Sequence, residues 1–190
     1  MADTRDRILD AARACLLRSG YANLSTRAVA EEAEVGTGHL HYHFGSKRNL
    51  VLAVLEAENQ RRLERQALMY GDDAPLWKQW EQACDYLDED LGSGYVRILQ
   101  EMIAAGWTEP DIAAAVREML TGWYQLLVEV AERAGRELGS IGPFTPRELA
   151  VLVGDAFIGA ESLVLLDTEP ELPHREALRK VGELIRAVET

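Results

Sequence analysis

The side chains best suited to bind another molecule are hydrogen-bond donors gathered in a short stretch near the start of the chain. Hydroxyl, imidazole, guanidinium and ammonium groups donate to phosphate oxygens, and arginine with guanine is the commonest specific base contact. This set of donors favours nucleic-acid binding. The alternative is that these side chains form an ordinary solvated surface. The set comprises Thr26, Thr37, His41, Tyr42 and Lys47 as phosphate or positioning contacts, Arg27 and His39 as candidates for base edges, and Gly38 for close approach.

Two short helices joined by a tight turn would position these groups. Ser25 can cap the first helix by accepting a bond from a backbone N–H. Gly36 suits the break after it, where a left-handed or capping conformation costs glycine little. Leu40 and Phe44 recur four residues apart and must face a core, so their neighbours point outward. Ser46 can cap the next helix. Such a helix-turn-helix inserts its second helix into the DNA major groove.

This stretch resembles the TetR family of bacterial transcriptional regulators. The shared features are the opening helix TRDRILDAARACLLRSGY, the core Thr26-Arg27-Ala28-Val29-Ala30, and the pattern G-x-L-x-x-H-F-x-S-K-x-x-L from Gly38 to Leu50. The match covers about the first quarter of the chain. It implies an all-α regulator with an N-terminal helix-turn-helix domain and a C-terminal helical domain for effector binding and dimerisation.

One position departs from the family pattern. His41 stands where the family commonly has a tyrosine associated with a phosphate contact. Histidine donates to a phosphate only in the correct tautomer or when protonated. We therefore expect operator affinity to depend on pH below about 7. Operator titrations of wild type and His41→Phe between mildly acid and neutral pH test this, and parallel curves would contradict it.

Other chemistry finds little support. His39 and His43 share a helical face at the spacing of a metal pair, but no third ligand lies nearby, so we predict no metal and no cofactor. An enzyme on a helical bundle would need a convergent set of catalytic groups, which the sequence does not present. Cys15 and Cys84 lie far apart in helical patterns and are predicted to be reduced core residues of a cytoplasmic protein.

Charge is distributed unevenly along the chain. The net charge is −12, yet residues 1–50 hold seven Lys and Arg against six Asp and Glu. An acidic remainder would repel the phosphate backbone and orient the other end toward DNA. Charged residues interrupt any signal peptide at the start, and the longest apolar stretch, residues 149–166, contains Asp155 and Glu161 and is a poor membrane span.

No segment alternates with a period of two, so the periodicity predicts an all-α chain. We expect residues 1–50 to form the DNA-binding domain and residues 51–190 the effector-binding and dimerisation domain. A first helix would run from about Thr4 to Arg18 and stop at Ser19-Gly20. A longer helix from Ser46 to about Tyr70 would link the domains as a lever. Further helices are expected at about 75–90, 93–105, 110–138, 146–167 and 173–189.

The helix at 146–167 is apolar around nearly its whole circumference and must be buried on two sides. With the last helix it could form a four-helix bundle across a two-fold axis, as expected of a homodimer that reads a palindrome. The alternative is a monomer whose central helix is encased. The predicted interface comprises Leu152, Ala156, Gly159, Ala160, Leu163, Val181, Leu184, Ile185 and Val188.

Aromatic and methionine side chains concentrate after the N-terminal segment. The family binds a small effector among its central helices, so these residues could line an apolar pocket. Taken singly, each is more often part of a plain core. The predicted lining comprises Trp77, Trp80, Tyr86, Met102, Trp107, Met119, Trp123 and Phe157. We expect a regulator, most simply a repressor, that leaves double-stranded operator DNA when a small molecule binds. An activator or a ligand-independent regulator is the alternative.

Overall fold

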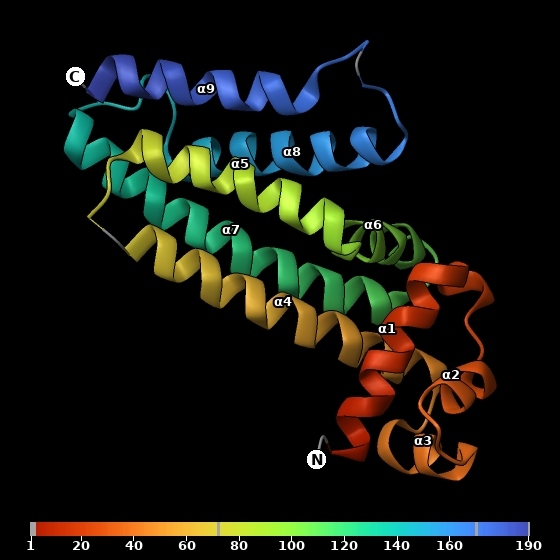
Figure 1. Cartoon of the computed structure of the whole chain (residues 1–190). Coiled ribbons are helices and arrows are strands. Elements are labelled where there is room, and N and C mark those ends of the chain that lie inside the picture. Colours follow the sequence, from red (N-terminus) through yellow and green to blue (C-terminus); the bar gives the residue numbers. More distant parts are fainter. Residues whose placement is uncertain (1–2, 72, 170, 190) are drawn as a thin grey trace. The chain divides into compact units, whose positions relative to one another are not determined.

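The structure is a computed structural model that describes residues 3–71, 73–169 and 171–189. Over these residues the chain forms nine α-helices and no strand (Figure 1), which confirms the all-α prediction. The helices are α1 (Thr4–Asn23), α2 (Thr26–Glu32), α3 (Thr37–Phe44), α4 (Lys47–Gly71), α5 (Leu76–Ser93), α6 (Tyr95–Gly106), α7 (Pro110–Leu138), α8 (Pro146–Leu165) and α9 (His174–Glu189). None of these helices is long and apolar enough to cross a membrane.

The chain divides into two compact units. Unit 1 comprises Met1–Arg61 and Arg97–Met119, and unit 2 comprises Arg62–Val96 and Leu120–Thr190. This division differs from the boundary expected at residue 50, because most of α6 and the start of α7 belong with the N-terminal helices. The pairing joins residues about 80 positions apart, which helical periodicity along the chain does not reveal.

Unit 1 has an apolar core shared by its helices. The apolar stripe predicted for the first helix is buried, namely Ile8, Ala12, Cys15 and Leu16. Side chains from the next three helices are also completely buried, among them Val29, Leu40 and Leu50. Burial of a residue such as leucine stabilises a fold by about 1.5–3 kcal/mol, so this core holds α2 and α3 in place.

Gly20 ends the regular part of α1. Its backbone has φ 72° and ψ 168°, which side-chain-bearing residues rarely adopt. A Cβ at this position would also lie 3.0 Å from a carboxylate oxygen of Glu101. The predicted stop at Ser19-Gly20 is therefore confirmed, although the helix resumes as a short turn to Asn23.

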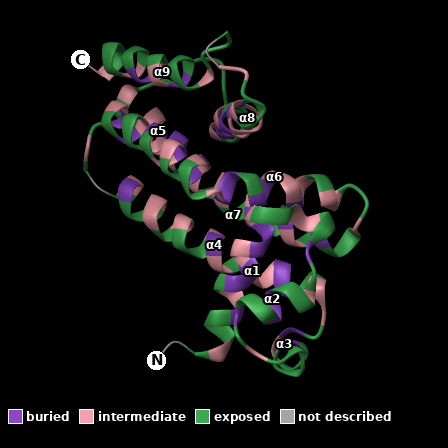
Figure 2. Cartoon of the chain, turned by 45° about the vertical axis from the view of Figure 1, so that its right-hand side comes forward, coloured by how far each residue is buried: buried purple, intermediate pink, exposed green. Residues whose placement is uncertain are grey.

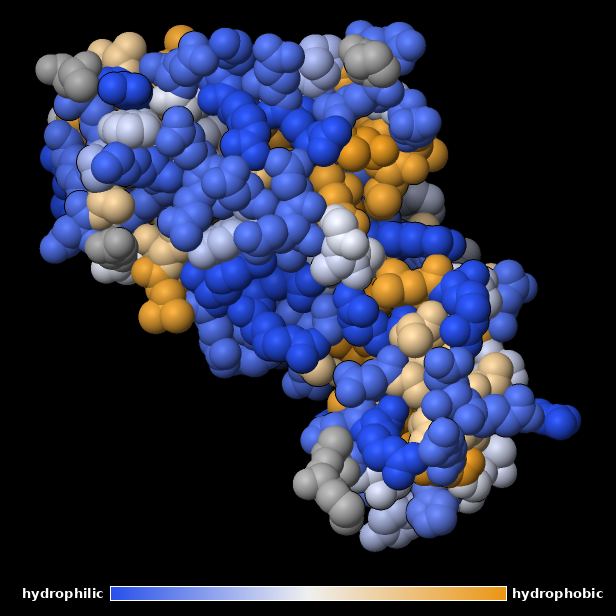
Figure 3. All heavy atoms as spheres, viewed as in Figure 1, coloured by the Kyte–Doolittle hydropathy of each residue, from blue (hydrophilic) through white to orange (hydrophobic). Residues whose placement is uncertain are grey.

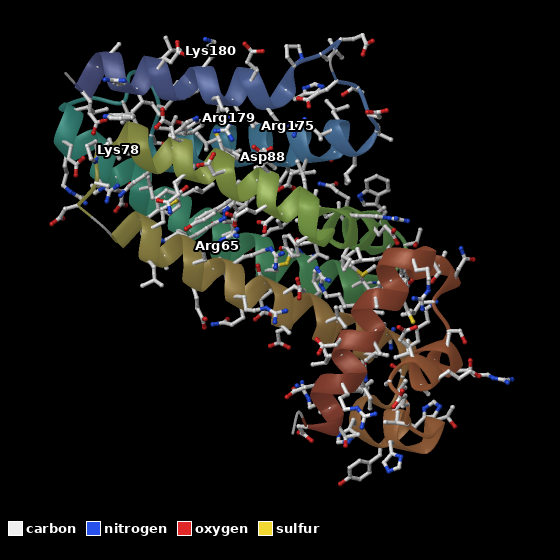
Figure 4. The ribbon with its side chains drawn as sticks, in the orientation of Figure 1. Arg65, Lys78, Asp88, Arg175, Arg179 and Lys180 are labelled. Atoms are coloured by element: carbon white, nitrogen blue, oxygen red, sulfur yellow. The ribbon has the colours of Figure 1, made fainter. Side chains whose placement is uncertain are left out.

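In unit 2, α5, α8 and α9 pack against one another. The indole Nε1 of Trp80 on α5 donates to the carbonyl oxygen of Leu178 on α9 over 2.7 Å. Gly182 permits this approach, since a Cβ there would lie 3.1 Å from Trp80 Cδ1. Arg175 and Arg179 of α9 both pair with Asp88 of α5 (Figure 4). Such partly exposed pairs contribute less than about 1 kcal/mol each, so apolar packing and the indole bond dominate.

The first turn of α8 is fixed by a capping box. Pro146 occupies the first turn, as predicted, and Thr145 Oγ1 accepts a hydrogen bond from the Glu148 backbone over 3.3 Å. The Glu148 carboxylate accepts from the Thr145 backbone N–H over 2.7 Å. These bonds from Thr145 lower the pKa of Glu148, because they favour the ionised form.

Candidate functional site

The turn between α2 and α3 is held by backbone geometry and by an arginine from α1. Glu34, rather than Gly36, adopts the left-handed conformation, with φ 53°. Gly36 is the N-cap residue of α3, with φ −71° and ψ 145°, so it adopts the capping one of the two conformations expected at the break. Arg7 Nη2 donates to the carbonyl oxygen of Ala33 over 2.5 Å and lies 3.4 Å from that of Glu34. Long-range support from α1 therefore stabilises a turn that its own residues do not favour.

The two faces of α3 divide as the sequence indicated. Leu40 and Phe44 are buried in the core of unit 1. The remaining surface of the helix is largely exposed (Figure 2). The predicted contacts on it all face solvent, namely Thr37, Gly38, His39, His41 and Tyr42. Tyr42 is 85% exposed, and no atom lies within 4 Å of a Cβ built at Gly38, so another molecule can approach this face closely.

His41 makes a hydrogen bond that bears on its predicted role. Its Nδ1 lies 3.2 Å from the carbonyl oxygen of Gly45, which only accepts, so Nδ1 carries the proton of this bond. A neutral ring then has an unprotonated Nε2, which accepts and does not donate. A phosphate contact through Nε2 therefore requires the protonated imidazole.

The two cations of the predicted contact set are differently placed. The Arg27 side chain is 83% exposed, and its Nε lies 2.9 Å from Glu31 Oε1. Lys47 Nζ donates to the carbonyl oxygen of Ala22 over 3.2 Å and lies 4.9 Å from the ring centroid of Tyr21. Arg27 can exchange a weak surface pair for DNA, whereas Lys47 also ties the start of α4 to the residues before α2.

The remaining predicted features of this region lie at helix starts. Thr26 is the half-buried first residue of α2. Ser25 precedes it but makes no side-chain capping bond, contrary to expectation. Ser46 does cap α4, since its Oγ accepts from the Asn49 backbone N–H over 3.1 Å.

Sequence reasoning missed a polar cluster around Tyr21. Its backbone N–H donates to Glu101 Oε2 over 2.5 Å, and its hydroxyl lies 3.0 and 2.9 Å from the two carboxylate oxygens of Glu109. Nearby in unit 1, Arg48 Nη1 lies 2.6 Å from Asp111 Oδ2. These contacts fasten the segment before α2, and the start of α4, to α6 and α7. No local pattern signals them, because the partners are distant in sequence.

The sequence of this chain is similar to those of known transcriptional regulators. Residues 8–54 match the model of a family described as bacterial regulatory proteins, tetR family. The HTH-type transcriptional regulator UidR of Escherichia coli strain K12 is 27% identical over 180 residues, which cover 92% of this chain and 86% of UidR. The HTH-type transcriptional repressor KstR of Mycolicibacterium smegmatis is 40% identical over 72 residues, 36% of this chain and 35% of KstR.

The chain belongs to the TetR family. The fold agrees, since FadR from Bacillus subtilis in complex with stearoyl-CoA superimposes with a TM-score of 0.80 at 14% identity, covering 95% of this chain and 96% of that one. As a TetR-family protein, the chain is a helix-turn-helix transcriptional regulator, as the residues from Ser25 to Leu50 indicated. The roles of its individual side chains remain predictions.

Unit 2 of this TetR-family protein contains an apolar cavity of about 360 Å³. It lies among the end of α4, α5, the C-terminal half of α7, α8 and α9. Apolar side chains dominate its lining, among them Trp80, Leu127, Val153, Val181, Ile185 and Val188. The size and character match those of small-molecule pockets.

The residues predicted to line one pocket are distributed over several places. Trp80 lines the apolar cavity of about 360 Å³, whereas Tyr86, Trp123 and Phe157 line a small one of about 40 Å³. Trp77 borders a third cavity, about 390 Å³ in volume and bounded by charged side chains.

The other three predicted lining residues lie in unit 1. Met102 and Met119 are buried in its core, and Trp107 is 82% exposed after the end of α6. None of them lines these three cavities. Methionine and tryptophan at helical spacing indicate burial, but spacing does not identify the core to which a residue belongs.

The predicted dimer residues fall into two groups. Leu152, Leu184 and Val188 are 54%, 68% and 67% exposed. Ala156 and Leu163 are also exposed, Gly159 is half-buried, and a Cβ there would meet no atom within 4 Å. Ala160 is buried, and Val181 and Ile185 are half-buried against the apolar cavity. The outer group of α8 and α9 is thus available for a partner.

More apolar surface lies at the end of α8. Leu165 and Leu166 are 39% and 73% exposed there, and Figure 3 shows apolar side chains at the surface in this region. Contiguous exposed apolar surface is uncommon on monomeric proteins and usually marks an interaction site.

Proposed function

We propose that this regulator is a homodimeric repressor that binds a palindromic operator and leaves it when a small molecule binds in unit 2. The observation that carries the DNA-binding part is the division of α3, whose two large apolar side chains are buried while its donor side chains are exposed together. An exposed recognition helix of this kind suits the major groove.

On this proposal, base edges are read by Arg27 and His39. Thr26, Thr37, His41, Tyr42 and Lys47 hold phosphates, and Gly38 lets the backbone approach DNA. The list follows the donor chemistry of each side chain and its place on α2, α3 or the start of α4. The half-sites of a two-fold dimer would lie about 34–36 Å apart, one duplex turn, or a multiple of it.

The dimer is supported by the exposed apolar residues of α8 and α9. Leu152, Leu184 and Val188 would be covered by the same residues of a second copy, as the two-fold symmetry of an isologous interface requires. Single large exposed residues are ordinary, but a row of them on two adjacent helices is not.

Release by a ligand is supported by the cavity and by α4. This helix carries Tyr70, which lines the cavity, and begins at Lys47, which only Gly45 and Ser46 separate from α3. A ligand that prefers the DNA-free conformation by a factor of 100 supplies about 2.7 kcal/mol against operator binding. KstR is named a repressor, and FadR holds stearoyl-CoA; both are consistent with this mode of action.

Gel-shift titration against genomic DNA upstream of the gene and against random duplex tests the proposal. We expect specific binding to exceed non-specific binding by at least about a thousandfold. Arg27→Ala should weaken specific binding by about tenfold or more, whereas Lys78→Ala, which removes the same charge from the exposed surface of unit 2 (Figure 4), should not. Equal affinity for every duplex would refute the proposal.

A further inference from the structure

The apolar cavity of about 360 Å³ in unit 2 has an uncharged lining. None of the described residues that border it is charged, and its polar members are Tyr70, Gln79 and Ser140. An isolated charge transferred into such surroundings loses its hydration without gaining a partner, which costs several kcal/mol or more. A ligand that fills this space must therefore be neutral over the buried part of its surface.

Two of the three polar side chains already have partners. Gln79 Nε2 donates to the carbonyl oxygen of Met69 over 3.2 Å, and its Oε1 accepts from Arg133 Nη2. Ser140 Oγ accepts from the Gly142 backbone N–H over 3.1 Å and is exposed. Neither side chain therefore presents a buried, unpaired polar atom to a ligand.

Tyr70 differs from both. Arg133 Nη1 donates to its backbone carbonyl oxygen over 2.7 Å, which fixes the residue at the end of α4. Its hydroxyl makes no hydrogen bond to any residue that the structure describes. Burial raises the pKa of Tyr70, so the hydroxyl stays protonated at neutral pH. Tyr70 borders both this cavity and the small one of about 40 Å³. It is therefore a neutral group beside the apolar cavity that is able to donate to, or accept from, a ligand.

The volume limits the ligand's size. The cavity has a volume of about 360 Å³. This value lies at the lower end of small-molecule pockets, at roughly 300–1,000 Å³. Long chains or several fused rings would exceed it unless part of the molecule remained outside.

We propose that this cavity binds a small, neutral, mainly apolar molecule whose hydroxyl or carbonyl group bonds to the Tyr70 hydroxyl. That this molecule is the effector rests on the proposed function; that the cavity binds it does not. The chemical class follows from the uncharged lining, the single unpaired hydroxyl and the volume.

Calorimetric titration of the full-length protein tests the class with three probes of equal chain length. Decan-1-ol should bind, and decanoate and decylammonium should each bind at least about tenfold more weakly, because a charged head placed at the Tyr70 hydroxyl would have no charged partner among the lining residues. Equal or tighter binding of either ion would overturn the proposal, as would failure of decan-1-ol to bind.

Two variants locate the binding. Ala134→Leu adds three carbon atoms to a side chain that lines the cavity and should weaken decan-1-ol binding by about tenfold or more. Ala114→Leu makes the same change on the exposed face of α7 and should leave binding unchanged. Tyr70→Phe removes only the hydroxyl and should weaken binding about fivefold. If neither Ala134→Leu nor Tyr70→Phe weakens binding, the probe binds elsewhere.

Further outcomes separate this inference from the proposed function. If decan-1-ol binds in the cavity but leaves operator affinity unchanged, the ligand class stands and release by this ligand fails. If a charged metabolite releases the protein from its operator while decan-1-ol does not bind, repression by release stands and the inferred ligand class fails. If Ala134→Leu alters self-association instead of ligand binding, a second copy occupies the site and the inference is wrong.

Discussion

The hydrogen bond between Tyr21 and Glu109 should stabilise the fold measurably. The Tyr21 hydroxyl lies 3.0 and 2.9 Å from the two carboxylate oxygens, and both side chains are half-buried. A hydrogen bond to a charged group contributes about 1.5–3 kcal/mol to the free energy of unfolding. Because both partners are partly exposed, we expect a contribution of about 1.5 kcal/mol here. Tyr21→Phe should therefore lower the free energy of unfolding by about that amount.

A double-mutant cycle isolates the bond from other effects of each substitution. Tyr21→Phe, Glu109→Ala and the double variant would be unfolded in urea and followed by circular dichroism. We expect a coupling energy of about 1–1.5 kcal/mol. Tyr42→Phe is the control, since its hydroxyl is on a side chain that is 85% exposed, and should change stability by less than about 0.5 kcal/mol. A coupling energy below about 0.3 kcal/mol would refute the assignment.

The same bond has a pH signature. Burial, the bond to Glu109 and the negative charge of Glu109 raise the pKa of Tyr21 to about 12. The folded state thus favours the neutral phenol, so its contribution is complete below about pH 10, the ordinary tyrosine pKa, and is lost as the pH rises toward about 12. Urea midpoints measured across this range should fall less in Tyr21→Phe than in wild type. Parallel curves would contradict the sign.

Three further predictions concern unit 2. Asp90→Asn should lower the free energy of unfolding in urea by about 3 kcal/mol, because the little-exposed Asp90 carboxylate lies 3.0 Å from Arg62 Nε and 2.8 Å from Arg65 Nη2. A loss below about 1 kcal/mol would show that these two ion pairs are not needed for stability. Leu184→Arg places a charge on the exposed face of α9 and should therefore produce monomers in sedimentation velocity. A dimer that persists in this variant would show that this face of α9 is not the dimer interface. Burial raises the pKa of Cys84 to about 11, so its thiol should react with a disulfide reagent at neutral pH only after unfolding, and rapid reaction of the native protein would contradict its burial.

The helix-turn-helix could be predicted because its signals are local. Leu40 and Phe44 define the buried face of α3 by their spacing alone, and the structure places both in the core. Gly20 and Pro146 mark a helix end and a helix start through their own backbone preferences. Each of these inferences needs only neighbours within a few residues, and tertiary packing did not override them.

Other features depended on partners distant in the sequence. The donors of Tyr21 meet carboxylates 80 and 88 residues away, and no periodicity connects them. Arg7 supports the turn before α3, in which Glu34 is the left-handed residue and Gly36 takes the capping position. Aromatic content indicated a cavity somewhere after the first domain, but the apolar cavity of unit 2 is lined mostly by aliphatic residues, which composition does not distinguish from ordinary core.

The left-handed backbone of Glu34 means that another residue at this position could stabilise the turn before the recognition helix. A residue with a side chain pays about 1 kcal/mol or more to hold positive φ, whereas glycine does not and asparagine tolerates it better. The Glu34 side chain is exposed, so its replacement would leave no hole and would remove a negative charge from the end of the molecule that meets DNA. Selection for tighter operator binding should therefore enrich glycine and asparagine at this position, and affinity would rise without any new contact to a base.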